Sequence, residues 1–153
     1  MMKTQCIFLL VILFAFFGNN VMAQKSADDL VGIWEPSSGK GRVKIEKIGG
    51  KYYGKVVWLK EPIDPETKKA KLDKSNPDPA LRTRPRLGLR VLKDFGFVSE
   101  GIWDNGTIYD PESGSTYNCK ITMKGRNTLD IRGYIGVSMF GRTDIWKRVE
   151  TKK

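Results

Sequence analysis

The chain has 153 residues and a net charge of +10, with 27 Lys and Arg against 17 Asp and Glu, and it contains no histidine. The absence of histidine excludes Ser–His and Cys–His nucleophilic pairs, histidine metal sites and the commonest general base. Two cysteines cannot form a zinc site alone, acidic residues that would suit calcium are interleaved with lysines, and no phosphate-binding or dinucleotide-binding glycine pattern occurs. We therefore expect no metal and no cofactor.

The N-terminal segment has the three-part layout of a secretory signal peptide. Lys3 is its only charge, residues 7–17 are apolar, and the small residues Val21 and Ala23 precede a cleavage point after Ala23. A membrane anchor is disfavoured because Gly18-Asn19-Asn20 interrupts the apolar run. The sequence predicts an exported protein, periplasmic or extracellular, with a signal peptide at 1–23.

Residues 24–153 are long enough for one domain that buries a core without disulfides. Their single cysteine, Cys119, is in phase with apolar neighbours, which indicates a buried and inert thiol. The positive excess favours anionic partners such as acidic lipids, but most charges alternate with apolar residues, which is typical of a solvated strand face. Export and the scatter of these charges argue against nucleic acid.

The first elements are predicted from capping, alternation and glycine. Ser26 caps a short helical turn that ends at Val31 and leads into a strand at 32–34. Residues 42–46 alternate with period two, Gly49-Gly50 supplies the positive φ of a tight hairpin, and a strand covers 51–59.

A proline-rich connection then runs from Lys60 to Arg86 and is far longer than a hairpin needs. Beyond it, the pattern predicts strands at 87–92, 98–103, 107–109, 116–123, 128–135 and 142–149. Turns are predicted at Asp104-Asn105-Gly106 and at 110–114.

This pattern predicts an all-β fold, a single antiparallel up-and-down barrel of eight or nine strands with one long loop. Closure is favoured because nearly every strand joins the next by a tight turn, and closing a sheet removes its exposed edges. The inward residues counted by alternation are Val43, Ile45, Tyr52, Val56, Trp58, Tyr117, Ile121, Met123, Leu129 and Ile131. With so many aromatic rings inside, we expect any cavity to be small.

Two sets of residues resemble known proteins. Gly32-x-Trp34 on the first strand, with Arg148 on the last, resembles the calycin signature, in which a tryptophan packs beneath an arginine. The wider pattern resembles the secreted bacterial family called domain of unknown function 2147 (DUF2147). It is carried by Gly32–Trp34, Gly54–Trp58, Asn76–Arg82, Arg84-Pro85, Gly88, Ile108–Pro111, Gly114, Thr116-Tyr117 and Trp146–Arg148. This resemblance implies a lipocalin-like β-barrel and implies no activity.

The Arg-Pro stretch, residues 76–88, allows two interpretations. In a β-strand, Arg82, Arg84 and Arg86 would share one face and present guanidinium groups to a carboxylate or phosphate. In polyproline geometry they would point in different directions and serve as scaffolding, with Asp73 and Asp78 as ion-pair partners.

The main functional hypothesis is a non-catalytic barrel that binds a small amphiphilic or anionic ligand in or at its mouth. The candidate ligand-binding residues are four aromatic side chains and two arginines: Tyr52, Trp58, Trp103, Tyr117, Arg82 and Arg84. The alternative for the aromatic rings is that they simply fill the core.

Two other classes of function stay open. The 60–86 loop is a candidate surface for an envelope partner, as in an interaction or inhibitor module. A carboxylate-dependent hydrolase would use Asp104, Asp110 or Glu112, although Asp110 and Glu112 also suit the turn in which they lie.

Overall fold

The computed structural model describes residues 26–150, so the predicted signal peptide at 1–23 lies outside the described residues. Three short 3-10 helices accompany the strands: η1 Ala27–Leu30, η2 Pro79–Leu81 and η3 Ser138–Phe140. The strands are β1 Gly32–Glu35, β2 Gly41–Ile48, β3 Lys51–Leu59, β4 Arg90–Ser99, β5 Ile102–Asp110, β6 Ser115–Gly125, β7 Thr128–Tyr134 and β8 Arg142–Arg148. Within this described span, no helix is long and apolar enough to cross a membrane.

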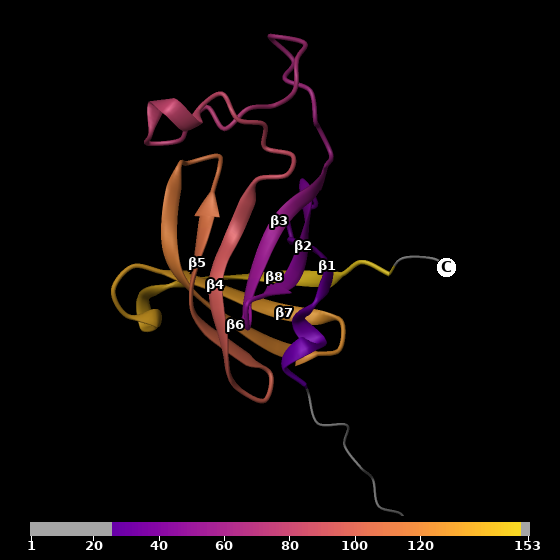
Figure 1. Ribbon diagram of the computed structural model, residues 1–153, viewed down its shortest axis with the longest axis vertical. Helices are drawn as coiled ribbons and strands as arrows, with labels where there is room; N and C mark the ends of the chain where they lie inside the picture. Colours follow the sequence, from indigo (N-terminus) through magenta and orange to yellow (C-terminus); the bar gives the residue numbers. More distant parts are fainter. Residues whose placement is uncertain (1–25, 151–153) are drawn as a thin grey trace, which may run out of the picture.

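The eight strands form one closed antiparallel barrel in which each strand pairs with its neighbours in sequence (Figure 1). Pairing of β1 with β8, with Trp34 opposite Arg148, closes it. The predicted up-and-down barrel is confirmed, with eight strands. Because the connections alternate between the two ends, β1–β2, β3–β4, β5–β6 and β7–β8 share one end, which we call the open end. The other three connections and η1 lie at the closed end.

Glycine marks a tight turn at one place in the barrel and a bulge within a strand at another. Gly49 and Gly50 have φ of 57° and 79° and join β2 to β3, as predicted. The turn predicted at Asp104-Asn105-Gly106 is wrong, because these residues form a bulge inside β5, with Asn105 at φ 61°. The chain turns instead between β4 and β5, at residues 100–101. Turns and bulges both use residues that tolerate positive φ, so the sequence signal is shared.

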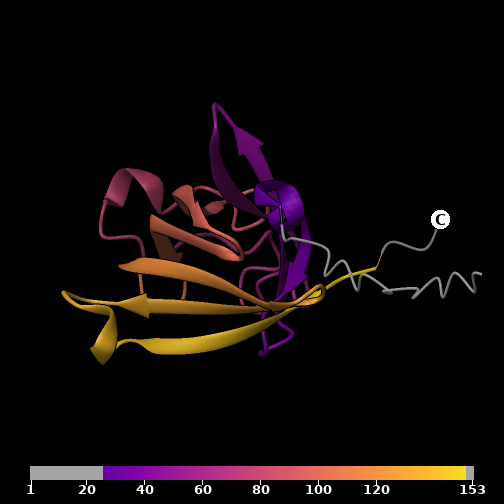
Figure 2. The same cartoon turned by 90° about the horizontal axis from the view of Figure 1, so that it is seen from below.

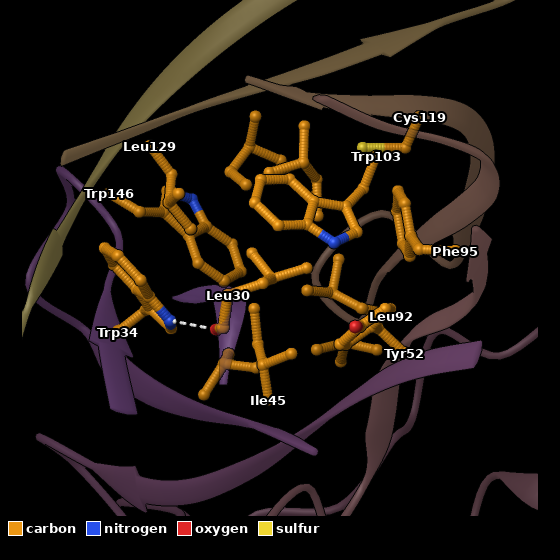
Figure 3. Close-up of a cluster of buried hydrophobic side chains, with 14 of the residues drawn as sticks. Leu30, Trp34, Ile45, Tyr52, Leu92, Phe95, Trp103, Cys119, Leu129 and Trp146 are labelled. Carbon is orange, nitrogen blue, oxygen red and sulfur yellow. Dashed lines mark hydrogen bonds between the residues drawn. The ribbon is translucent and has the colours of Figure 1, made fainter. Parts of the chain in front are cut away.

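The closed half of the barrel is filled by large side chains. Trp34, Tyr52, Phe95 and Trp103 are almost completely buried and lie in one cluster with Leu30 of η1 (Figure 3). The indole of Trp34 donates to the Leu30 carbonyl at 2.9 Å, and that of Trp103 donates to the Ala27 carbonyl at 3.1 Å. Both indole N–H groups are thereby satisfied inside the core, and η1 is fastened across this end.

Arg148 completes the closed end from the last strand. Its guanidinium carbon lies 4.1 Å from the centre of a Trp34 ring, and its Nη1 donates to the Val31 carbonyl at 3.0 Å. A Cβ at Gly32 would meet that Nη1 at 2.5 Å, so a side chain there would displace the arginine. The geometry explains why Gly32, Trp34 and Arg148 occur together in the calycin-like pattern.

Cys119 of β6 is fully buried, as the alternation predicts. Burial is the main reason that the pKa of its thiol is raised to about 12, with a smaller contribution from the charge of Asp104. The thiolate is therefore scarce at neutral pH, which fits the prediction of an inert thiol.

Candidate functional site: a cavity at the open end

A cavity of about 900 Å³ occupies the open half of the barrel. The prediction of a small cavity is wrong, because the largest aromatic side chains gather in the closed half. At the cavity, the inward positions carry mainly branched aliphatic side chains. Its apolar lining includes Val43, Val56, Leu59, Val91, Ile108, Ile131 and Trp146.

Strand β8 presents three different kinds of side chain to the cavity at alternate positions: one basic, one acidic and one aromatic. Trp146 is buried, Asp144 is half-buried, and Arg142 is exposed at the mouth; all three line the cavity. Asp144 accepts from the indole of Trp146 at 2.9 Å and from the hydroxyl of Ser37. Arg142 forms no side-chain hydrogen bond or ion pair with any residue from 26 to 150, so its guanidinium is unpaired within that span.

The mouth of the cavity carries charged side chains of both signs. Lys40 pairs with Glu112 at 3.3 Å, and both side chains are exposed. Arg86 donates through Nε to the Leu72 carbonyl at 3.1 Å and through Nη2 to the Pro111 carbonyl at 2.9 Å. These contacts hold Arg86 at the rim and leave part of its guanidinium available.

The long β3–β4 connection, residues 60–89, arches over the open end (Figure 1) and is fastened to the barrel by a buried polar network. Its centre is Asp73, which is completely buried. The carboxylate of Asp73 accepts from the Tyr109 hydroxyl at 2.6 Å, from the Asn76 amide at 2.9 Å and from Arg84 Nη2 at 2.9 Å. Since Tyr109 belongs to β5, this network ties the loop to the barrel wall.

The network also shifts the pKa values of its members. Burial alone would raise the pKa of Asp73, but hydrogen bonds from Tyr109, Asn76 and Arg84 outweigh it and lower the pKa below its ordinary value. The pKa of Tyr109 is raised, first by burial and then by the hydrogen bond that the Tyr109 hydroxyl donates to Asp73. Asp73 is therefore a carboxylate at neutral pH and serves as an anchor for the loop.

Of the four aromatic residues predicted to bind a ligand, only Tyr117 lines the cavity. Tyr52 and Trp103 lie in the closed half, where the Tyr52 hydroxyl donates to Asp28 at 2.7 Å. Trp58 points outward and is 38% exposed, with the Arg42 guanidinium 4.6 Å from its ring centre. The register between β2 and β3 shifts near this point, which reverses the alternation and turns Leu59 inward in place of Trp58.

The Arg-Pro stretch is not a strand, so its arginines do not form a row. Residues 79–81 form η2, and a single bridge joins Leu72 to Pro85. Arg82 donates to the Asn76 carbonyl at 2.7 Å, and Arg84 pairs with Asp73. These contacts support scaffolding for Arg82 and Arg84, whereas Arg86 lines the cavity.

The acids of the hydrolase alternative are divided by the fold. Asp104 lies in the β5 bulge and outside the cavity lining, whereas Asp110 and Glu112 lie at the mouth. Asp110 accepts from the Glu112 amide at 2.9 Å and from the Ser113 hydroxyl at 2.7 Å, which are contacts within its own turn. Both are thus engaged, Asp110 in the turn and Glu112 with Lys40.

Sequence reasoning missed Arg142, Asp144 and Trp146 as cavity residues. The signal was present, because they alternate along β8 with Arg148, whose inward direction follows from the calycin-like pattern. Alternation shows that these side chains point inward, but it does not show how far along the barrel axis each one lies. That depth decides whether an inward side chain packs at the closed end or faces the cavity.

The fold and the cavity define a lipocalin-like barrel: a closed up-and-down barrel with one capped end and one hollow end. The chain belongs to the family described as uncharacterized proteins conserved in bacteria (DUF2147), whose model matches residues 32–148. A similar solved structure is that of protein HP1028 from Helicobacter pylori, described as belonging to the lipocalin family. It is 28% identical, with a TM-score of 0.67 over 79% of this chain and 83% of that one. No curated protein was found to match the chain.

Proposed function

We propose that the protein is an exported, non-catalytic barrel that binds a small amphiphile with an anionic head group. The observation that carries the proposal is the cavity of about 900 Å³ with apolar walls and a charged mouth. Its volume lies within the range of about 300–1,000 Å³ typical of small-molecule sites. The signal-peptide pattern of residues 1–23 supports export, and the absence of histidine supports a binding role over catalysis.

The order of side chains along β8 orients the ligand. An apolar tail would lie against Trp146 and the aliphatic walls, where burial of each methylene contributes about 0.8 kcal/mol. An anionic head group at the depth of Asp144 would meet a like charge, so it stays at the mouth, where Arg142 and Arg86 offer guanidinium groups. Tyr117 on β6 also lines the cavity and contributes a further part of its wall.

A titration with a matched pair of ligands tests this function. A long-chain fatty acid and the fatty alcohol of the same length are added to residues 24–153, and binding is followed by tryptophan fluorescence and by calorimetry. We expect both to bind and the acid to bind more tightly. Of the four tryptophans, Trp146 lines the cavity, so Trp146→Phe should remove most of the fluorescence change while calorimetry still detects binding.

Two substitutions separate the head-group site from the cavity. Arg142→Gln should weaken binding of the fatty acid roughly 3- to 10-fold and leave binding of the alcohol unchanged, as expected for the loss of an ionic contact at an exposed rim. Val56→Phe should weaken both at least roughly tenfold, because the new ring occupies the cavity. Absence of binding by both ligands, in fluorescence and in calorimetry, would overturn the proposal.

A further inference from the structure

The β7–β8 connection, residues 135–141, is unusually apolar for an exposed segment. The side chains of Ile135, Val137, Met139 and Phe140 are 77%, 58%, 77% and 79% exposed. Figure 2 shows β7 and β8 running side by side to the outer edge of the molecule, where the chain turns through η3. Large apolar side chains gathered in one exposed segment mark a contact surface.

The backbone of this segment is already hydrogen-bonded within the protein. Arg132 of β7 donates through Nε to the Ser138 carbonyl at 2.6 Å and through Nη2 to the Met139 carbonyl at 3.0 Å. The amide of Phe140 donates to the Val137 carbonyl at 3.2 Å. Satisfied backbone groups lower the cost of moving such a segment out of water and into an apolar phase.

The charged residues in the stretch of sequence that contains the segment are all basic. Arg132 and Arg142 bracket it, and no Asp or Glu occurs from residue 131 to residue 143. The whole chain carries a net charge of +10. An apolar tip with basic flanks is the combination that binds anionic lipid surfaces, where the rings and chains enter the interface and the cations meet the head groups. A second copy docking tip to tip would instead bring two cationic segments together.

The position of the segment at the cavity mouth connects it to the binding site. Ile135 and Phe140 line the cavity as well as facing solvent, whereas Val137 and Met139 are not part of the lining. A bilayer in contact with this tip would therefore lie directly at the entrance of the cavity.

We propose that residues 135–140 insert into the interface of an anionic lipid bilayer and hold the cavity mouth against it. The membrane is then the surface from which the amphiphile enters or to which it is delivered; this second clause rests on the proposed function. The membrane contact itself depends only on the exposed apolar tip and its arginines.

Vesicle binding tests the contact. The protein used is residues 24–153, which contain every strand of the closed barrel and lack the apolar run 7–17 that would itself bind lipid. It is mixed with vesicles of phosphatidylglycerol and phosphatidylcholine in equal parts, or of phosphatidylcholine alone, and the bound fraction is measured by co-sedimentation. We expect binding to the anionic vesicles, at least roughly fivefold weaker binding to the neutral ones, and a decrease with salt.

The discriminating variant is Val137→Ser with Met139→Ser, which removes two apolar side chains outside the cavity lining. Its matched control is Ile48→Ser with Val98→Ser, which removes two exposed apolar side chains, 48% and 57% exposed, near closed-end turns. The tip variant should lose at least roughly tenfold in vesicle binding, and the control should bind as the wild type does. Both change exposed side chains only, and thermal unfolding verifies that both remain folded.

Three outcomes would overturn the proposal: equal vesicle binding by tip variant and wild type, no binding by the wild type, or a wild-type dimer in sedimentation velocity that the tip variant lacks. The fatty-acid titration without vesicles separates the two proposals. The tip variant should keep its affinity for the fatty acid. Vesicle binding without fatty-acid binding would support the membrane contact and overturn the proposed ligand function. Fatty-acid binding without vesicle binding would support the ligand function and overturn the membrane contact.

Discussion

The two halves of this barrel are built by the same eight strands, yet one is packed solid and the other is hollow. In the closed half, Trp34, Tyr52, Phe95 and Trp103 fill the interior and η1 covers the end. In the open half, aliphatic side chains leave a cavity of about 900 Å³, and a polar network holds the long connection above it. The packing that stabilises the barrel and the cavity that we propose binds a ligand therefore lie at opposite ends of one fold, and we expect that they can be changed separately.

The largest effect is expected from removing the centre of the closed half. Trp34→Ala should lower the free energy of unfolding by about 3–5 kcal/mol, because it leaves a large void, frees the Leu30 carbonyl and removes the ring beneath Arg148. Urea unfolding followed by circular dichroism measures this change. A loss below about 1 kcal/mol would contradict the view that this end carries the stability.

A pair of isoleucines compares the halves directly. Ile45 and Ile131 are 1% and 2% exposed, but only Ile131 lines the cavity. Ile45→Ala should cost about 3–4 kcal/mol and Ile131→Ala about 1–2 kcal/mol, because the latter side chain has fewer packing partners to lose. In the fatty-acid titration, Ile131→Ala should change the affinity and Ile45→Ala should not. Equal costs in unfolding and equal effects on binding would remove the distinction between the halves.

The buried polar network around Asp73 should make the free energy of unfolding decrease at acidic pH. The pKa of Asp73 is lowered in the folded protein, so its contribution to stability is present above the ordinary value of 3.8 and is lost as the pH falls through the folded-state value. Asp73→Asn should cost about 1–3 kcal/mol at pH 7, because the ion pair with Arg84 is lost.

Urea unfolding at pH 7 and pH 3 measures this contribution. The loss of stability between the two values should be smaller in Asp73→Asn than in the wild type. Glu150→Gln is the control: Glu150 is exposed and forms no hydrogen bond or ion pair with any residue in the described span, so this change should leave the pH dependence as it is. An identical pH dependence in Asp73→Asn would show that Asp73 is not the group that responds.

Much of the fold could be predicted from the sequence because local chemistry determines it. The Gly49-Gly50 hairpin and the buried Cys119 follow from turn preference and alternation, and the packing of Trp34 with Arg148 is what the resemblance to the calycin signature implies. The errors occur where two structures share one signal. Asn105-Gly106 suits both a turn and a bulge, and the register shift between β2 and β3 reverses the direction of Trp58.

The candidate site was less predictable, since it depends on contacts between distant parts of the chain. Of the predicted ligand-binding residues, Tyr117 lines the cavity, but Tyr52 and Trp103 lie at the other end, and Arg82 and Arg84 are used by the loop itself. The sequence offered Asp73 as an ion-pair partner for the arginines, but it did not show that Arg84 would pair with it or that Arg82 would donate to the Asn76 carbonyl.

The sequence by itself determined the barrel and the face of most strands that turns inward, because alternation with period two is a property of the extended chain. Only the tertiary structure decided which half is filled, where the cavity lies and which arginine remains free at its mouth. Alternation specifies the direction of a side chain but not its depth along the barrel axis. Depth depends on the stagger of all eight strands and on which side chains from distant strands meet at each level.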